Sequence, residues 1–280
     1  MAKKRVTLPK DFEELLKKND LDELKAVFSK CEPDARGGYG KQTAFSFDEC
    51  SHELAKWLVE QGADLEATDT WGKTALHNRS RFTRGNIESL LELGANIHAR
   101  DNYGDTPLHK AASAHNNENT VILLQYGANK DQVNSAGLTP PELLLQSCRN
   151  TDIPNTVTTS KTYLDAGSQI TPKMKEYVTA IGRNFEFHRA GFNKESVDEV
   201  SEALEELYKL FQVEPVAKRA LHDGKSPITV STKKWQDQHD ELWELLVPSG
   251  GAAETIQGEV IRIPGRISRE LHGNGGGNWD

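Results

Sequence analysis

The sequence lacks any long hydrophobic run. None of its apolar stretches approaches the roughly 18 consecutive residues that a membrane-spanning helix needs, so we expect no transmembrane segment. The basic start of the chain, residues 1–5, is followed by the acidic residues Asp11, Glu13 and Glu14 rather than by an apolar segment, which excludes a secretory signal. By default, these absences predict a cytoplasmic protein.

Cysteines and basic clusters are also scarce. The three cysteines among 280 residues, Cys31, Cys50 and Cys148, have no metal-ligand spacing, and their odd number favours free thiols in a reducing compartment. Acidic residues outnumber basic ones by 42 to 34, the net charge is −8, and no run of Lys or Arg exceeds three, so we expect no nucleic-acid partner. The acidity either reflects an ordinary soluble surface or steers the protein toward a basic partner.

What the sequence does contain is a recurring phrase, which reads Thr-Pro-Leu-His in its clearest copy. The starting threonines of the four copies are spaced 31, 32 and 33 residues apart: Thr43, Thr74, Thr106 and Thr139. Each copy is followed by a glycine that ends an apolar run: Gly62, Gly94, Gly127 and Gly167. This two-part signature, with a period near 33 residues, resembles the ankyrin repeat.

Each copy can be understood from local preferences. Thr106 suits a helix N-cap, and Pro107 suits the first helical turn because no hydrogen-bond donor is needed there. The second helix ends at Gly127, because glycine readily adopts the left-handed conformation that follows a helix. The resemblance implies a helix pair with a projecting β-turn finger in each unit, hence an all-α solenoid with short β-turn fingers. It also implies that His77 and His109 bond to the backbone near the finger loops, and we prefer this role to a catalytic one.

The chain divides into three regions. Residues 1–40 are predicted to form an N-terminal helical cap with amphipathic helices at 11–18 and 20–29, the second of them capped by Asp20. Residues 41–183 hold four ankyrin-like repeats. The fourth has about eight extra residues rich in Thr, Ser, Asn and Pro, so we expect an inserted loop at 150–161.

Residues 184–280 are predicted to form a mainly helical C-terminal domain of unknown role. Apolar residues at helical spacing indicate helices at 195–213 and 235–246, and a further helix at 252–271 that Pro264 breaks or kinks. Residues 227–230 are expected to form a short strand. This region resembles a C-terminal extension of uncharacterised bacterial proteins, some of which carry ankyrin repeats, and that resemblance implies no activity.

The second repeat departs from the family pattern. Arg79 and Ser80 stand where ankyrin repeats have paired alanines, which predicts either looser packing against the first repeat or an ion pair between Arg79 and a carboxylate.

Aromatic residues precede the glycines of three fingers. Tyr39, Trp71 and Tyr103 are 32 residues apart and should align along one edge of the stack, where exposed aromatics often anchor a protein partner. The alternative is local packing against the next finger. The resemblance implies contacts from the fingers and first helices, and it marks these protein-binding residues: Tyr39, Lys41, Thr70, Trp71, Lys73, Arg81, Phe82, Arg100, Asn102, Tyr103, Asp105 and Ser113. For Phe82, burial against Arg79 is the alternative.

The favoured function is therefore a protein-binding scaffold or adaptor. More specific versions are a toxin-neutralising (immunity) protein of a bacterium and a host-directed bacterial effector. The competing hypothesis is an enzyme whose C-terminal domain acts on a partner that the repeats recruit, which requires His222, His239, Glu254 and Arg262 to converge in a cleft. Because no nucleophile, phosphate-binding or metal-ligand motif is present, we expect no catalytic residue, no metal and no cofactor.

Overall fold

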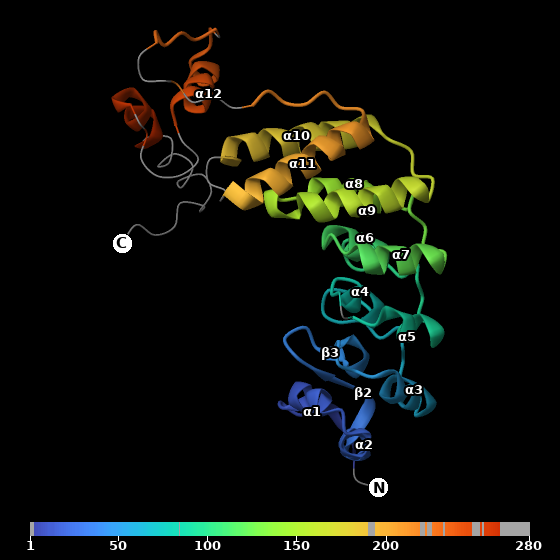
Figure 1. Cartoon of the computed structure of the whole chain (residues 1–280). Coiled ribbons are helices and arrows are strands. Elements are labelled where there is room, and N and C mark those ends of the chain that lie inside the picture. The colour runs from blue at the N-terminus through green and yellow to red at the C-terminus, as the bar shows by residue number, and fades with distance from the viewer. Residues whose placement is uncertain are drawn as a thin grey trace.

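The computed structural model describes most of the chain: residues 3–83, 85–189, 194–218, 222, 226–231, 233–247, 253 and 255–263. Figure 1 shows helix pairs that are stacked in chain order, from α1 and α2 at the N-terminal end to α10 and α11. The protein is thus a mainly helical repeat protein, as the sequence predicts.

The N-terminal end combines two helices with three short strands. Helices α1 (Phe12–Lys18) and α2 (Leu21–Lys30) match the two predicted helices, and the side chain of Asp20 caps α2 by accepting the N–H groups of Asp22 and Glu23. The prediction of a helical cap misses the strands β1 (Arg5–Thr7), β2 (Cys31–Gly37) and β3 (Gln42–Thr43). They form one sheet in the order β1-β2-β3, with β1 parallel and β3 antiparallel to β2.

The helices of the repeats begin and end where the recurring phrase predicts. The first three units consist of the short 3₁₀ turn η1 (Ala44–Ser46) with α3 (His52–Glu60), α4 (Ala75–Arg79) with α5 (Ile87–Glu92), and α6 (Pro107–Ser113) with α7 (Asn117–Gln125). In each unit the threonine lies at the N-cap of the first helix or turn. The glycines after the second helices have φ between +82° and +93°, the left-handed conformation that favours glycine.

The fourth unit corrects the predicted loop at 150–161. It consists of α8 (Pro140–Gln146), the short turn η2 (Asn150–Asp152) and α9 (Ile153–Asp165), so the extra residues lengthen the second helix. Thr156 and Thr159 are buried on the inner side of α9, and their hydroxyls donate to carbonyls four residues earlier, at 2.9 and 2.8 Å. Because the helix itself satisfies these hydroxyls, a polar composition does not prevent burial here.

The stack continues past its predicted end. Helices α10 (Pro172–His188) and α11 (Lys194–Phe211) pack on α8 and α9, and the four helices share one hydrophobic core that includes Leu145, Val157, Phe185 and Leu207. The predicted domain boundary at residue 183 is therefore wrong, because it falls inside α10. Gly182 allows the close packing of this pair, since a Cβ atom there would lie 1.7 Å from the Tyr208 hydroxyl oxygen.

The remaining described residues are partly helical. Helix α12 (Trp235–Leu246) has the predicted bounds, and residues 256–263 form another helix near its C-terminal end. Residues 227–230 have no regular structure, so the predicted strand is wrong. The expected break at Pro264 lies outside the described residues. Within the described ranges, every helix is too short or too polar to span a bilayer.

Candidate protein-binding edge

The finger tips are joined to one another through their backbones. We call the tips at residues 38–41, 70–73, 102–105 and 134–137 the finger edge. The N–H of Thr70 donates to the carbonyl of Gly40 at 3.0 Å, and the N–H of Asn102 donates to the carbonyl of Trp71 at 3.1 Å. The N–H of Ser135 likewise donates to the carbonyl of Tyr103 at 3.0 Å. The four tips therefore form one continuous strip.

A short polar side chain closes each of the last three fingers. The Asp69 carboxylate accepts the N–H groups of Trp71 and Lys73 at 2.8 and 2.9 Å. Asp101 and Asn134 accept the corresponding N–H groups of the next two fingers, at 2.9 to 3.0 Å. Such side-chain hydrogen bonds fix the turn, so the tips are preformed before any partner arrives.

The two histidines of the recurring phrase hold neighbouring units together. Nδ1 of His77 accepts the N–H of Thr74 at 3.2 Å, and its Nε2 donates to the carbonyl of Asp105, in the next finger, at 2.9 Å. His109 repeats this arrangement with Thr106 and the carbonyl of Leu138. Burial lowers the pKa of His77 to about 4 and also lowers that of His109, so both rings are neutral at pH 7. Their contacts agree with the structural role that we predicted.

These finger and histidine contacts recur in consecutive units of the stack. Residues 43–134 are ankyrin repeats. The family model for ankyrin repeats, with three copies, matches this range. No curated protein matches the chain. The match covers about a third of the sequence, so strands β1 and β2, the unit formed by α8 and α9, and everything after it lie outside the matched repeats.

The three finger aromatics differ in how much of each is exposed. Tyr39 is 94% exposed and Tyr103 is 60% exposed, as an anchoring role requires. Trp71 is half-buried: its ring lies 5.9 Å from that of Tyr39, and it covers Gly40 so closely that a Cβ there would approach to 2.5 Å. Local packing therefore explains Trp71 in part, whereas the tyrosines of the first and third fingers are open to a partner.

Asp105 is the predicted site residue that is least accessible. It is buried, and its carboxylate lies 2.6 Å from the Lys110 ammonium, which also lies 2.7 Å from Asp101. The side-chain amide of Asn134 donates to the other Asp105 oxygen at 2.7 Å. Asp105 thus links two ankyrin units internally, and the prediction that it contacts a partner does not fit this geometry.

The remaining predicted contacts lie at or near the surface. Exposed residues are Lys41, Thr70, Arg81, Phe82, Arg100 and Asn102, and Lys73 and Ser113 are partly buried. Sequence reasoning missed Arg36, which reaches this edge from β2 and donates to the carbonyls of Lys41 and Thr68. No sequence signal marked it, because the strand that carries it was not predicted.

Arg79 corrects both expectations for the second repeat. Its side chain is fully buried, and its guanidinium donates to the carbonyls of Phe45 and Cys50 at 2.6 and 2.9 Å, with longer contacts to two further carbonyls. No carboxylate among the described residues forms an ion pair with it. The guanidinium therefore ties the first two units together instead of loosening them. Phe82 is 50% exposed, so it is not buried against Arg79.

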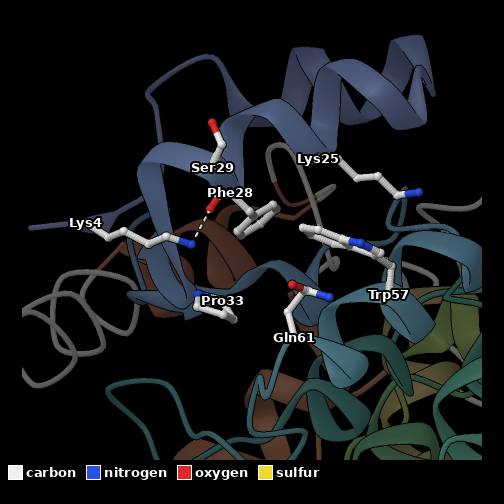
Figure 2. A pocket seen from close by; sticks show the side chains of 7 residues that line it. All are labelled: Lys4, Lys25, Phe28, Ser29, Pro33, Trp57 and Gln61. Carbon is white, nitrogen blue, oxygen red and sulfur yellow. Dashed lines mark hydrogen bonds between the residues drawn. The ribbon is translucent and has the colours of Figure 1, made fainter. Parts of the chain in front are cut away.

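A small cavity lies between α2 and α3, apart from the finger edge. Figure 2 shows its lining of Lys4, Lys25, Phe28, Ser29, Pro33, Trp57 and Gln61. The Lys25 ammonium lies 5.8 Å from the Trp57 ring centre, and Lys4 donates to the carbonyl of Phe28 at 2.9 Å. Its volume of about 180 Å³ is below the roughly 300–1,000 Å³ of typical small-molecule pockets, so it is a weaker candidate site.

The candidate catalytic residues of the C-terminal region have local partners. His222 faces the carbonyl of Ser226 at 2.9 Å, and Arg262 holds Glu259 with two hydrogen bonds of 2.8 and 2.6 Å. The ring of His239 lies beside that of Trp243, and Glu254 is outside the described residues. The described residues contain no group of three or more possible metal ligands.

Proposed function

We propose that this protein is a scaffold that binds another protein along its finger edge and the adjoining surface of the first helices. Ankyrin repeats generally mediate protein–protein interactions, and residues 43–134 are such repeats. A cytoplasmic location is proposed with it, supported by the absence of disulfides among Cys31, Cys50 and Cys148.

The observation that carries this proposal is the pair of tyrosines held out on a preformed strip. Tyr39 and Tyr103 are largely exposed, although burying a tyrosine would stabilise the protein. Each sits on a tip whose backbone is fixed to its neighbour by hydrogen bonds. A partner that covers them therefore gains apolar contact without ordering the loop, which is what gives an interface residue a large effect on affinity.

Action by binding, without catalysis, is part of the proposal. Of the C-terminal candidates, the described side chains of His222, His239 and Arg262 each engage residues close in sequence. A site for acid–base or nucleophilic chemistry needs such groups within hydrogen-bond reach of one reacting atom, and these contacts draw the groups to separate neighbours.

The test is site-directed photo-crosslinking in cells of the native organism. A photoreactive phenylalanine analogue replaces Tyr103 in one variant and Tyr126 in the control, because Tyr126 is also an exposed tyrosine (45%) but caps the C-terminal end of the second helix of its unit. We expect one protein species to be crosslinked from position 103 and not from position 126. Equal capture from both positions, or from neither, would refute the proposed use of the finger edge.

A further inference from the structure

The finger edge carries positive charge that the rest of the described structure does not balance. Lys41 and Lys73 lie on the first two finger tips, Arg81 follows α4, and Arg100 lies just before the third tip; Lys73, Arg81 and Arg100 belong to the matched repeats. Among the described residues, no carboxylate forms an ion pair with any of them, whereas Lys110 beside them has two such partners. The local charge is thus opposite in sign to the net charge of −8 for the whole chain.

The carboxylates of the fingers are turned inward. Asp69 and Asp101 are buried and accept backbone N–H groups of their own tips, and Asp105 is held by Lys110. At the bases of the fingers, Asp34 and Glu66 accept N–H groups of the following unit at 2.8 and 2.7 Å. These acids are therefore committed to building the fingers. The charged side chains of the finger tips that remain for a partner are the cations Lys41 and Lys73, beside aromatic and neutral polar ones.

Lys73 shows this imbalance most clearly. The residue is partly buried and its ammonium lies 5.2 Å from the Trp71 ring centre, and no carboxylate in the described part of the chain lies within ion-pair distance of it. Burial lowers the pKa of Lys73, and the nearby charges of Lys110 and Arg81 lower it further, while the charges of Asp69 and Asp101 offset only part of this decrease. A carboxylate placed here would offset both effects, because it would neutralise a partly desolvated cation.

We propose, resting on the function proposed above, that the finger edge binds an extended, carboxylate-rich segment of the partner protein. Its carboxylates would meet Lys41, Lys73, Arg81 and Arg100, and its side chains between them would cover the exposed tyrosines. Neighbouring helix layers are about 8–10 Å apart, so the span from the first to the third finger is about 20 Å. An extended segment of about six residues covers that span, at about 3.3 Å per residue.

The chemistry favours a protein segment over a nucleic acid. A polyphosphate chain is repelled by the net charge of −8 over its whole length, whereas a short acidic segment senses mainly the charges within a Debye length of about 8–10 Å. The net charge had suggested a basic partner. On this proposal the net charge of −8 disfavours a partner that is strongly acidic overall, while the finger edge binds an acidic segment of that partner.

The test uses three labelled probes and fluorescence anisotropy with the full chain. One probe is a twelve-residue peptide in which Glu and Ser alternate, the second has Gln in place of Glu, and the third is a twelve-nucleotide single-stranded DNA. The variant Lys73→Gln/Arg81→Gln is compared with Lys17→Gln/Lys56→Gln, whose two lysines are exposed on α1 and α3 and have the same total charge.

The Glu peptide should bind more tightly than the Gln peptide and than the DNA. The finger variant should lower the affinity for the Glu peptide about three- to tenfold, because each surface ion pair changes an affinity by less than about tenfold. The control variant should leave this affinity unchanged. Raising the salt from about 0.1 to 1 M should remove the preference, because the Debye length falls from about 10 to 3 Å. Equal binding of the two peptides, equal effects of the two variants, or tighter binding of the DNA would overturn the proposal.

Failure here and failure of the proposed function are distinguishable. If position 103 captures a specific protein but the Glu peptide shows no preference, the scaffold function stands and the acidic segment is wrong. If neither position captures a protein, the scaffold function itself fails.

Discussion

Replacing Arg79 by alanine tests whether a buried guanidinium holds the first two ankyrin units together. Alanine is the residue that the family pattern places here. If arginine were only an unfavourable departure from that pattern, the substitution should increase the stability of the protein. The structure predicts the opposite. Arg79 is fully buried and donates to the carbonyls of Phe45 and Cys50 at 2.6 and 2.9 Å.

The magnitude follows from what alanine leaves behind. Two buried carbonyls lose their donor, at a cost of about 1–3 kcal/mol each, and the emptied space adds a cavity term. Relief of the burial of a charged group, and water entering the space, offset part of this loss. We expect a net decrease of about 3 kcal/mol in the free energy of unfolding.

Urea denaturation followed by circular dichroism measures the change. Arg81→Ala is the matched control, because Arg81 is exposed and two residues away, and it should change the stability by less than about 0.5 kcal/mol. Because stacked repeats can unfold in parts, the Arg79 variant should also show an early transition of the N-terminal units. Unchanged or increased stability of Arg79→Ala would show that the carbonyl contacts contribute nothing.

Four further substitutions, in three experiments, probe the stack. Gly94→Val should lower the stability by about 1 kcal/mol or more in thermal unfolding. Gly94 has φ +93° with open space around it, so the cost is purely conformational. An unaltered melting curve would contradict the assignment of Gly94 to the end of the helix. His77 is buried and neutral, with a folded pKa of about 4 against about 6.5 unfolded, so the stability it contributes is full above pH 6.5 and falls by up to about 3 kcal/mol as the pH drops to 4. His77→Gln should flatten this part of the plot of urea midpoint against pH. An identical slope in both proteins would disprove this role of His77. Gly182→Ala should destabilise the α10–α11 pair, and adding Tyr208→Phe should recover part of the loss, whereas independent effects of the two changes would rule out the close contact.

The repeat period was predictable because its signals are local. A threonine N-cap and a glycine in the left-handed conformation each act within a few residues, so they mark helix ends in any context. The positions of Thr74 and Gly94 therefore predicted the start of α4 and the end of α5 almost to the residue. The same reasoning placed the aromatics at equivalent finger tips, and the contacts of His77 followed from the family resemblance.

Features that depend on distant contacts were missed. Strand β1 has three exposed residues and pairs with β2, more than twenty residues later, so neither burial nor periodicity marks it. Helix α9 is rich in threonine, and its burial depends on packing against α7 and α11. Asp105 was predicted to contact a partner because the sequence does not reveal its ion pair with Lys110, five residues later, or its hydrogen bond from Asn134 in the next finger.

The continuous core of α8 to α11 determines where the chain can be shortened without damage. A fragment ending at residue 183 cuts through α10 and removes α11, which uncovers Val157 and Val178 and should promote aggregation. A fragment that ends after Phe211 keeps every buried side chain of that core. Binding and stability can therefore be measured on residues 1–213 without the segment that carries α12, and any partner retained by this shorter protein must be recognised by the stack alone.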